Sequence, residues 1–283
     1  MLTTTVFSPW NESTDMVRKS FWSAKKSDRH LLYQLSVQNV EQEEEFLTGT
    51  FKKLRGREPL TLREDFCGTA LSSAEFVKNG ESRSAVGYDL DAEVLAYGQE
   101  KNIDPLGPDA DRVQLLQKNV VSVSRKKFDI CAAMNFSYFI FKKRTDMLKY
   151  YECVYKSLND EGVFFLDIYG GSEAQVVLEE NRDIDEGFVY IWDQAAYNPI
   201  DNSVLNHIHF EFAKGPRMSK AFTYDWRLWT PQEVVECLEE VGFKNVEVYW
   251  ELEDEDGEET GIYEPAKVVE NQEGWLAYIV ASK

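Results

Sequence analysis

The chain has 283 residues, of which 43% are hydrophobic, and its formal net charge is −19. This length and apolar content suit one large domain, or one domain with a sizeable insertion. The negative charge disfavours nucleic-acid substrates, because phosphate neutralisation needs clustered lysine and arginine side chains.

The sequence also bears on the expected compartment. It contains no apolar run of about 18 residues, so we expect no membrane span. Its first residues, "MLTTTVFSPWNESTDM", lack the basic and apolar regions of a secretory signal. The four cysteines are scattered without CxxC spacing, which argues against zinc or disulfides. We therefore expect a cytoplasmic protein.

The first half of the chain alternates between helical and strand patterns. Apolar spacing predicts one helix over residues 29–54. Strands are then predicted at 60–65, 84–90, 113–120, 127–136 and 162–170, and helices at 70–80, 91–101 and 145–162. We expect Thr145 to cap the last of these helices, and Gly80 and Gly162 to end the first and last. This alternation indicates a parallel sheet with helices on both faces.

The pattern changes after residue 170. Residues 187–229 hold three segments with two-residue alternation, which predict an antiparallel insertion of about three strands. A helix should then run from the capping box of Thr230 and Glu233 to Gly242. Strands at 244–252 and 274–282 close the chain. We interpret the loop between them, "EDEDGEETG", as an acidic turn, because it lacks the ligand spacing of an EF-hand.

The stretch "TLREDFCGTALSSAEFV", residues 61–77, indicates a strand, a turn and a helix, the arrangement that places a ligand at the carboxyl ends of parallel strands. Asp89, 21 residues beyond Gly68, can accept hydrogen bonds from both hydroxyls of a ribose. A dinucleotide loop needs three glycines, but this turn has only Gly68. Glu64 and Asp65 would oppose a phosphate and favour a cation. A sulfonium nucleoside therefore fits better than NAD or FAD.

The segments "LREDFCGTA", "AVGYDLD", "NV" and "DICAAMNFSYF" resemble motif I and its successors in class I S-adenosylmethionine-dependent methyltransferases. The resemblance covers roughly residues 60–170 and the closing strands. Motif I departs from the family pattern at two glycines, which Phe66 and Ala70 replace. The DFCGTA variant is similar to a family of bacterial and plant proteins described as methyltransferases.

The resemblance implies a fold and a domain division. The fold is α/β, a Rossmann-like seven-stranded mixed sheet with helices on both faces, an antiparallel β insertion after strand five and a closing antiparallel hairpin. Residues 1–58 would form an N-terminal helical cap. Residues 59–283 would form the methyltransferase domain, with the β-rich insertion at about 187–229.

The resemblance also implies the residues around the methionine and ribose parts of the cofactor. Glu64, Phe66 and Gly68 would form the loop that faces the methionine part. Asp89 would bind the ribose, and Leu90 would flank the adenine. Alternatively, Glu64 caps a helix, and Asp89 is an exposed residue at the start of the next helix.

Two further strand ends complete the implied cofactor site. Asn119 would hydrogen-bond the adenine amino group, with Val120 beside it. Asn135 and Phe136 would lie near the sulfonium. Alternatively, Asn135 is an ordinary turn residue.

Five residues are candidates for contact with the substrate. Arg29 and Tyr33 belong to an N-terminal helix of the kind that covers the cofactor in the resembling enzymes. Tyr138 follows the fourth strand and would lie at the rim of the site. Trp226 and Arg227 belong to the aromatic-rich insertion. The alternatives are packing for the aromatic residues and a surface role for Arg29.

Two histidines in "NHIHFEF" need a separate interpretation. His207, His209 and Glu211 share one strand face and could hold a metal or act as a base. We favour a solvated sheet face with cross-strand partners such as Asp225 or Arg227, and we predict no metal site.

These patterns predict an S-adenosylmethionine-dependent methyltransferase that acts on a nitrogen or oxygen of a small molecule and releases S-adenosylhomocysteine. Because the cofactor supplies the reactive carbon, the protein mainly aligns the nucleophile, and no catalytic triad is expected. The alternatives are a protein or RNA methyltransferase, a cofactor-binding protein without turnover, and an NAD(P)-linked oxidoreductase. The sequence is compatible with a monomer or a homodimer.

Overall fold

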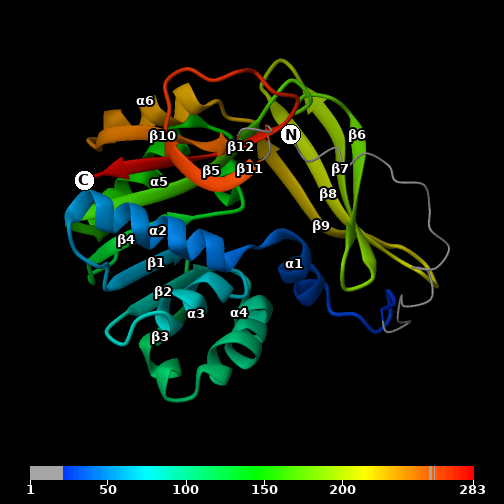
Figure 1. Cartoon of the computed structure of the whole chain (residues 1–283), viewed down its shortest axis with the longest axis horizontal. Coiled ribbons are helices and arrows are strands. Elements are labelled where there is room, and N and C mark those ends of the chain that lie inside the picture. The colour runs from blue at the N-terminus through cyan, green and yellow to red at the C-terminus, as the bar shows by residue number, and fades with distance from the viewer. Residues whose placement is uncertain (1–21, 255–256, 258) are drawn as a thin grey trace. The chain divides into compact units, whose positions relative to one another are not determined.

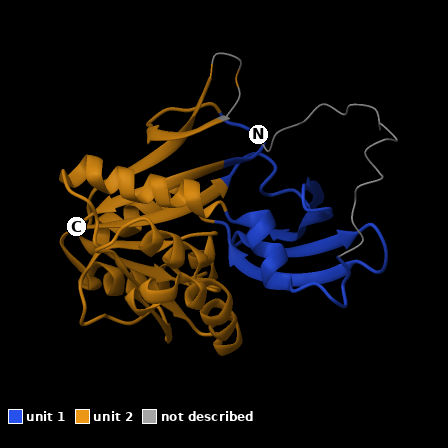
Figure 2. Cartoon of the chain, turned by 60° about the horizontal axis from the view of Figure 1, so that its bottom comes forward, with its two compact units in different colours: residues 1–38, 170–228, 271–275 blue, residues 39–169, 229–270, 276–283 orange. Residues whose placement is uncertain are grey.

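The computed structural model describes residues 22–254, 257 and 259–283. The chain forms two compact units, coloured separately in Figure 2. The smaller unit consists of the described residues up to 38, residues 170–228 and residues 271–275. The larger unit consists of residues 39–169, 229–270 and 276–283, as far as they are described. None of the described helices is both long and apolar enough to cross a membrane.

The larger unit is built on an eight-stranded sheet with the order β11-β10-β12-β5-β4-β1-β2-β3 (Figure 1). Strands β1 to β5 pair in parallel, and β10 runs antiparallel to β11 and β12. This confirms the predicted mixed sheet with one additional strand, β11. The strands are β1 (Thr61–Asp65), β2 (Ser84–Asp89), β3 (Val113–Gln117), β4 (Phe128–Ala133), β5 (Leu158–Gly170), β10 (Lys244–Glu253), β11 (Glu259–Pro265) and β12 (Trp275–Ser282).

Helices cover both faces of this sheet, as consecutive residues of β5 demonstrate. The Phe165 ring lies 5.9 Å from the ring of Phe46 on α2, whereas Phe164 lies 6.1 Å from Tyr150 on α5. Because consecutive strand residues point to opposite faces, α2 and α5 lie on different sides. The helices are α2 (Val40–Arg55), α3 (Leu71–Lys78), α4 (Ala92–Gly98), α5 (Arg144–Ser157) and α6 (Pro231–Val241), with short π and 3₁₀ turns at Gln99–Ile103, Asp104–Arg112 and Ser137–Ile140.

The predicted helix boundary is correct where a side chain caps the helix. The capping box of Thr230 and Glu233 is present at α6, which ends at Gly242 in the left-handed conformation. The predicted cap at Thr145 is wrong, because α5 already begins at Arg144 without a side-chain cap. Gly162 does not end α5, because β5 begins at Leu158. Similarly, α3 ends at Lys78 with Asn79 as its C-cap, so Gly80 does not end it.

The smaller unit contains helix α1 (Arg29–Val37) and a four-stranded antiparallel sheet. Leu32 of α1 belongs to the same buried cluster as Ile208 and Phe210 of the sheet. The sheet has one strand more than predicted, because the polar edge strand β6 lacks the alternation that signals a half-buried strand. Its strands are β6 (Leu178–Ile184), β7 (Phe188–Asn198), β8 (Ser203–Phe212) and β9 (Met218–Arg227).

The helix predicted over residues 29–54 is two helices. Helix α1 ends at Val37, and the side chain of Asn39 then caps α2 by accepting a hydrogen bond from the Gln42 N–H. The division between the two units falls at this break. Of the helical cap expected over residues 1–58, residues 1–21 lie outside the described part of the chain, and the described remainder is divided between the two units.

The close packing of Gly98, the last residue of α4, leads to a prediction about stability. A Cβ atom at Gly98 would lie 2.4 Å from the backbone oxygen of Thr69. We expect Gly98→Ala to lower the free energy of unfolding by about 1–3 kcal/mol, because backbone cannot yield as a flexible side chain does. Gly49→Ala is the matched control: it meets no atom within 4 Å and should stabilise α2 by roughly 0.5–1 kcal/mol. Urea unfolding measures both, and equal effects would contradict the packing argument.

Candidate functional site

The order of the strands defines where a ligand would bind. Within the sheet, β2 and β3 lie on one side of β1, and β4 and β5 lie on its other side. In open α/β sheets, ligands bind at the carboxyl ends of the strands beside such a switch point. The turn at residues 66–70 and the turn at residues 134–137 follow β1 and β4. The structure thus brings the predicted cofactor residues to one edge of the sheet.

The turn after β1 keeps a left-handed backbone at all three positions where the resembling motif has glycine. The φ angles are 56° at Phe66, 52° at Gly68 and 56° at Ala70. A side chain in this conformation costs about 1–2 kcal/mol. At Phe66, ring contacts with Phe141 and Tyr150, at 6.0 and 5.8 Å, offset that cost. At Gly68, an added Cβ would meet no atom within 4 Å, so the space beside the turn is open.

Asp89 fixes this turn to the end of β2. Its Oδ2 accepts a hydrogen bond from the Gly68 N–H at 2.9 Å, and its Oδ1 accepts one from the Asp91 N–H at 2.9 Å. The alternative that Asp89 begins the next helix is wrong, because Asp91 is the N-cap of α4. Each carboxylate oxygen keeps a second lone pair, which suits the ribose role predicted for Asp89. Leu90, expected beside the adenine, is 63% exposed.

A buried ion pair beneath the turn was not predicted. The Arg63 side chain is fully buried, and its Nε donates to Asp65 Oδ1 at 2.8 Å. Its Nη2 donates to the carbonyl of Val120 at 2.7 Å, and its Nη1 donates to the carbonyl of Ser122 at 3.1 Å. The guanidinium also lies 4.5 Å from the centre of the Tyr88 ring. Arg63 therefore ties the loop after β3 to the end of β1.

That loop carries the two residues expected beside the adenine. Asn119 is exposed, and its Oδ1 accepts a hydrogen bond from the Val121 N–H at 2.8 Å. The second lone pair of the same oxygen remains for an amino group. The Val120 side chain is buried, so it supports the loop from below.

The turn after β4 is held by a carboxylate that the sequence analysis missed. Asp167 accepts hydrogen bonds from the backbone N–H groups of Asn135 and Phe136, at 2.6 and 2.8 Å. Both residues have φ angles of 56°, a conformation that side chains disfavour. Asn135 is therefore a turn residue, as the alternative reading had it. Asp167 holds the turn that was expected to lie near the sulfonium.

Three buried carboxyl groups lie at this edge of the larger unit. Burial raises the pKa of Glu43 to about 8, that of Glu64 to about 7 and that of Asp167 to about 7. Glu64 also accepts hydrogen bonds from the N–H of Ser73, at 2.9 Å, and from its hydroxyl, which confirms that it caps α3. In the described part of the chain, no lysine or arginine pairs with any of the three. The cluster therefore suits a cationic ligand.

We expect the free energy of unfolding of the ligand-free protein to fall as the pH rises from about 5 to 8. Glu43, Glu64 and Asp167 have ordinary pKa values near 4 when unfolded but raised values when folded. Between these values the folded state holds protons that the unfolded state has lost. Each group then lowers stability by about 1.4 kcal/mol per pH unit. Burial lowers the pKa of His207 and gives an opposite slope, but from a single group.

Urea unfolding at several pH values across this range measures the effect. A stability that stays constant or rises with pH would contradict the assignment of three protonated carboxyl groups.

The substrate candidates do not gather in one unit. Tyr138, in the larger unit, is fully buried, and its hydroxyl donates to the Asp167 carbonyl at 2.9 Å. This placement agrees with the packing alternative and not with a position at the rim. In the smaller unit, the Tyr33 ring lies 5.0 Å from the Phe222 ring.

The other candidates also belong to the smaller unit. The Arg29 guanidinium lies 5.5 Å from the centre of the Phe222 ring. Trp226 is 5% exposed and stacks on Tyr224 at 4.3 Å, and Arg227 follows it half-buried on β9. Contact of these residues with a substrate stays a prediction.

The solvated face expected for the histidines is wrong, because His207 and His209 are each 4% exposed. His209 lies near Asp193 and Glu179 in a geometry that could surround a metal. However, the Lys220 N–H donates to His209 Nδ1 at 2.8 Å, so the ring proton is on Nε2. That proton donates to Asp193 at 3.1 Å. With both ring nitrogens engaged in this way, His209 offers no lone pair to a metal, and the group is a hydrogen-bonded network.

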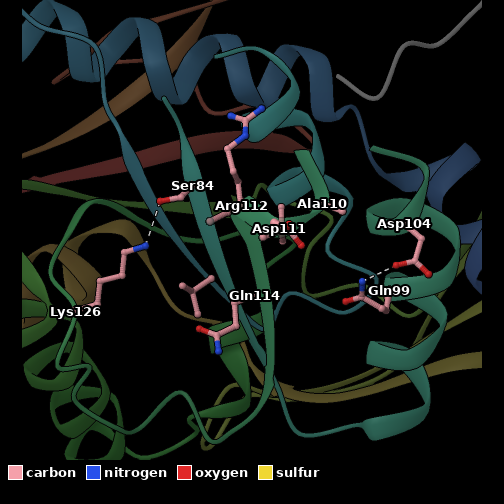
Figure 3. A pocket seen from close by; sticks show the side chains of 11 residues that line it. Ser84, Gln99, Asp104, Ala110, Asp111, Arg112, Gln114 and Lys126 are labelled. Carbon is pink, nitrogen blue, oxygen red and sulfur yellow. Dashed lines mark hydrogen bonds between the residues drawn. The ribbon is translucent and has the colours of Figure 1, made fainter. Parts of the chain in front are cut away.

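A separate hollow of about 650 Å³ lies at the amino ends of β2 and β3 (Figure 3). Ser84 and Lys126 line it and are joined by a hydrogen bond of 3.1 Å. Arg112, another lining residue, donates to the Arg83 carbonyl at 3.0 Å. None of the predicted site residues lines this hollow, so it is distinct from the edge that holds the glycine turn.

Known proteins share this architecture. A solved S-adenosylmethionine-dependent methyltransferase from Clostridium acetobutylicum superposes with a TM-score of 0.67 at 17% identity, covering 88% of this chain and 96% of that one. CalS10, an amino pentose methyltransferase from Micromonospora echinaspora solved with bound S-adenosylmethionine, gives a TM-score of 0.65 at 13% identity, covering 89% and 95%. The chain has the methyltransferase fold. Because the larger unit is only about two thirds of the chain, this methyltransferase likeness extends into the smaller unit.

Comparison of sequences alone finds less. No protein-family model matches the chain. YqeM of Bacillus subtilis (strain 168), which carries a provisional description as a methyltransferase, is 24% identical over 187 residues, covering 63% of this chain and 71% of that protein. The evidence for the methyltransferase fold therefore comes mainly from the structure.

Proposed function

We propose that the protein is a class I methyltransferase that transfers a methyl group from S-adenosylmethionine to a nitrogen or oxygen of a small molecule. The observation that carries the proposal is the bond between Asp89 and the Gly68 N–H at the switch edge of the sheet. This bond couples an open glycine turn to a carboxylate that would accept hydrogen bonds from a ribose. The DFCGTA form of this turn favours the bacterial and plant family that it resembles.

The residues at this edge fit the proposed cofactor. Glu64 and Gly68 would face its methionine part, and Asp89 would accept hydrogen bonds from its ribose hydroxyls. The adenine would lie between Leu90 and the loop of Asn119. When bound, the cofactor supplies an activated methyl carbon for in-line displacement, so the protein's task is alignment and exclusion of water. The buried carboxyl groups favour its positive charge over the phosphates of NAD.

Two observations favour a small acceptor. The net charge of −19 opposes polyanionic substrates. CalS10 is described as an amino pentose methyltransferase, and the likeness to it covers 89% of this chain. A small amine is therefore the acceptor class to test first. An amine must arrive deprotonated to attack the methyl carbon.

The test is a transfer assay with S-adenosylmethionine labelled at its methyl group. Candidate acceptors are amino sugars and small amines, small hydroxyl compounds, and mixed RNA or protein as the competing classes. We expect S-adenosylhomocysteine to form only when a small acceptor is present. Label in RNA or protein would favour the alternative of a macromolecular methyltransferase. Tight cofactor binding without transfer to any acceptor would favour a binding protein without turnover.

A further inference from the structure

Glu43, in the first turn of α2, is a buried carboxyl group without a cationic partner. It is 9% exposed, and its one hydrogen bond, from the Ser72 hydroxyl, is long at 3.4 Å. No lysine or arginine within the described residues pairs with it. Because burying an uncompensated carboxylate is costly, burial keeps Glu43 largely protonated in the ligand-free protein. Glu43 can ionise when a bound ligand supplies the positive charge.

The surroundings of Glu43 place it at the edge of the sheet that holds the turn of residues 66–70. The negative charges of Asp167 and Glu64 contribute to raising its pKa, and its own charge contributes to raising the pKa of Tyr278 on β12. Ser72, its hydrogen-bond partner, is next to Ser73, which binds Glu64. Both serines lie in the first turn of α3, directly after the glycine turn.

An independent observation is the open space at the turn itself. A side chain at Gly68 would meet no atom within 4 Å, and the backbone there has a positive φ of 52°. A ligand can therefore approach the backbone four residues before Ser72. Two carboxyl groups, from α2 and from β1, flank the helix that begins there.

We propose that Glu43, together with Glu64, binds the α-ammonium group of S-adenosylmethionine and makes the site selective for nucleosides that carry this group. The inference rests on the proposed function. Carboxylates and an ammonium form charge-assisted hydrogen bonds, which are stronger than neutral ones. The bound ammonium supplies the positive charge that the protein does not provide to Glu43.

The experiment compares two ligands on three proteins by calorimetric titration. The ligands are S-adenosylhomocysteine and its deaminated analogue, in which a hydrogen replaces the α-amino group. The proteins are wild type, Glu43→Gln and the matched control Glu45→Gln, an exposed position on the same helix. Glutamine keeps the shape of Glu43 and the hydrogen bond with Ser72. Burial already keeps Glu43 largely protonated near neutral pH, so Glu43→Gln should fold as the wild type does.

We expect Glu43→Gln to weaken S-adenosylhomocysteine binding about tenfold or more and to leave binding of the deaminated analogue within about twofold. Glu45→Gln should change neither. Unchanged affinity for S-adenosylhomocysteine, or an equal loss for both ligands, would overturn the inference and leave the proposed function intact. Failure of the wild type to bind either ligand would overturn the proposed function itself.

Discussion

Replacing Asp89 with alanine should lower the affinity for S-adenosylhomocysteine by about a hundredfold or more. The carboxylate has two tasks: it accepts the Gly68 N–H at 2.9 Å, and it would accept the ribose hydroxyls. Hydrogen bonds to charged groups contribute about 1.5–3 kcal/mol each, and about 1.4 kcal/mol is a tenfold change in affinity. Loss of two such bonds accounts for the expected magnitude. Calorimetric titration measures it.

Two further variants serve as controls for Asp89→Ala. Glu93→Ala, at an exposed position in the first turn of α4, should bind as the wild type does. Asp89→Asn keeps one acceptor oxygen, so its affinity should fall between those of the wild type and the alanine variant. If Asp89→Ala folds and binds within threefold of the wild type, the placement of the ribose at Asp89 is wrong.

Arg63→Met should lower the free energy of unfolding by about 3–5 kcal/mol, the usual cost of removing one partner of a buried ion pair. The Arg63 and Asp65 side chains are both fully buried. Loss of the guanidinium leaves Asp65 with the Tyr150 hydroxyl, which donates to it at 3.0 Å. It also removes one of the two donors to the carbonyl of Val120, which keeps the Ser122 N–H. Urea unfolding gives the free energy directly.

The Arg63 prediction has a surface control and a rescue. Lys53→Met breaks an exposed ion pair with Glu264, and such pairs contribute at most about 1 kcal/mol. Adding Asp65→Asn to Arg63→Met removes the uncompensated charge, so the double variant should be more stable than Arg63→Met alone. A loss of less than about 1 kcal/mol in Arg63→Met would contradict the view that this network supports the site.

The features that sequence predicted well are local ones. The capping box at Thr230 involves residues three apart, and the structure contains it. The position of Asp89 at a strand end beside the turn was predicted because a fixed distance along the chain needs no knowledge of packing. The left-handed backbone at Phe66 shows why a motif with a missing glycine still folds as the motif does. Ring contacts with Phe141 and Tyr150 offset the cost of the left-handed backbone, which a glycine would adopt without strain.

The features that sequence missed depend on contacts between distant residues. Asp167 is 31 residues from the Phe136 N–H that it accepts, and within "GVFFLDIYG" it has no signal that separates it from a strand residue. Glu43 lies on a helix before the first motif. His207 alternates with apolar residues as a solvated residue would, yet it is buried. A solvated and a buried histidine differ only in whether other residues cover that face of the sheet. The two-residue alternation of the sequence does not indicate such a cover.

We infer that the edge formed by Gly68 and Asp89 holds S-adenosylmethionine. The decisive measurement is calorimetric titration of the folded wild-type protein with S-adenosylmethionine, S-adenosylhomocysteine and NAD. We expect saturable binding of the first two at one site per chain, and no binding of NAD, whose phosphates the buried carboxyl groups oppose. Binding of NAD alone, or of none of the three, would contradict it and leave only a likeness of fold.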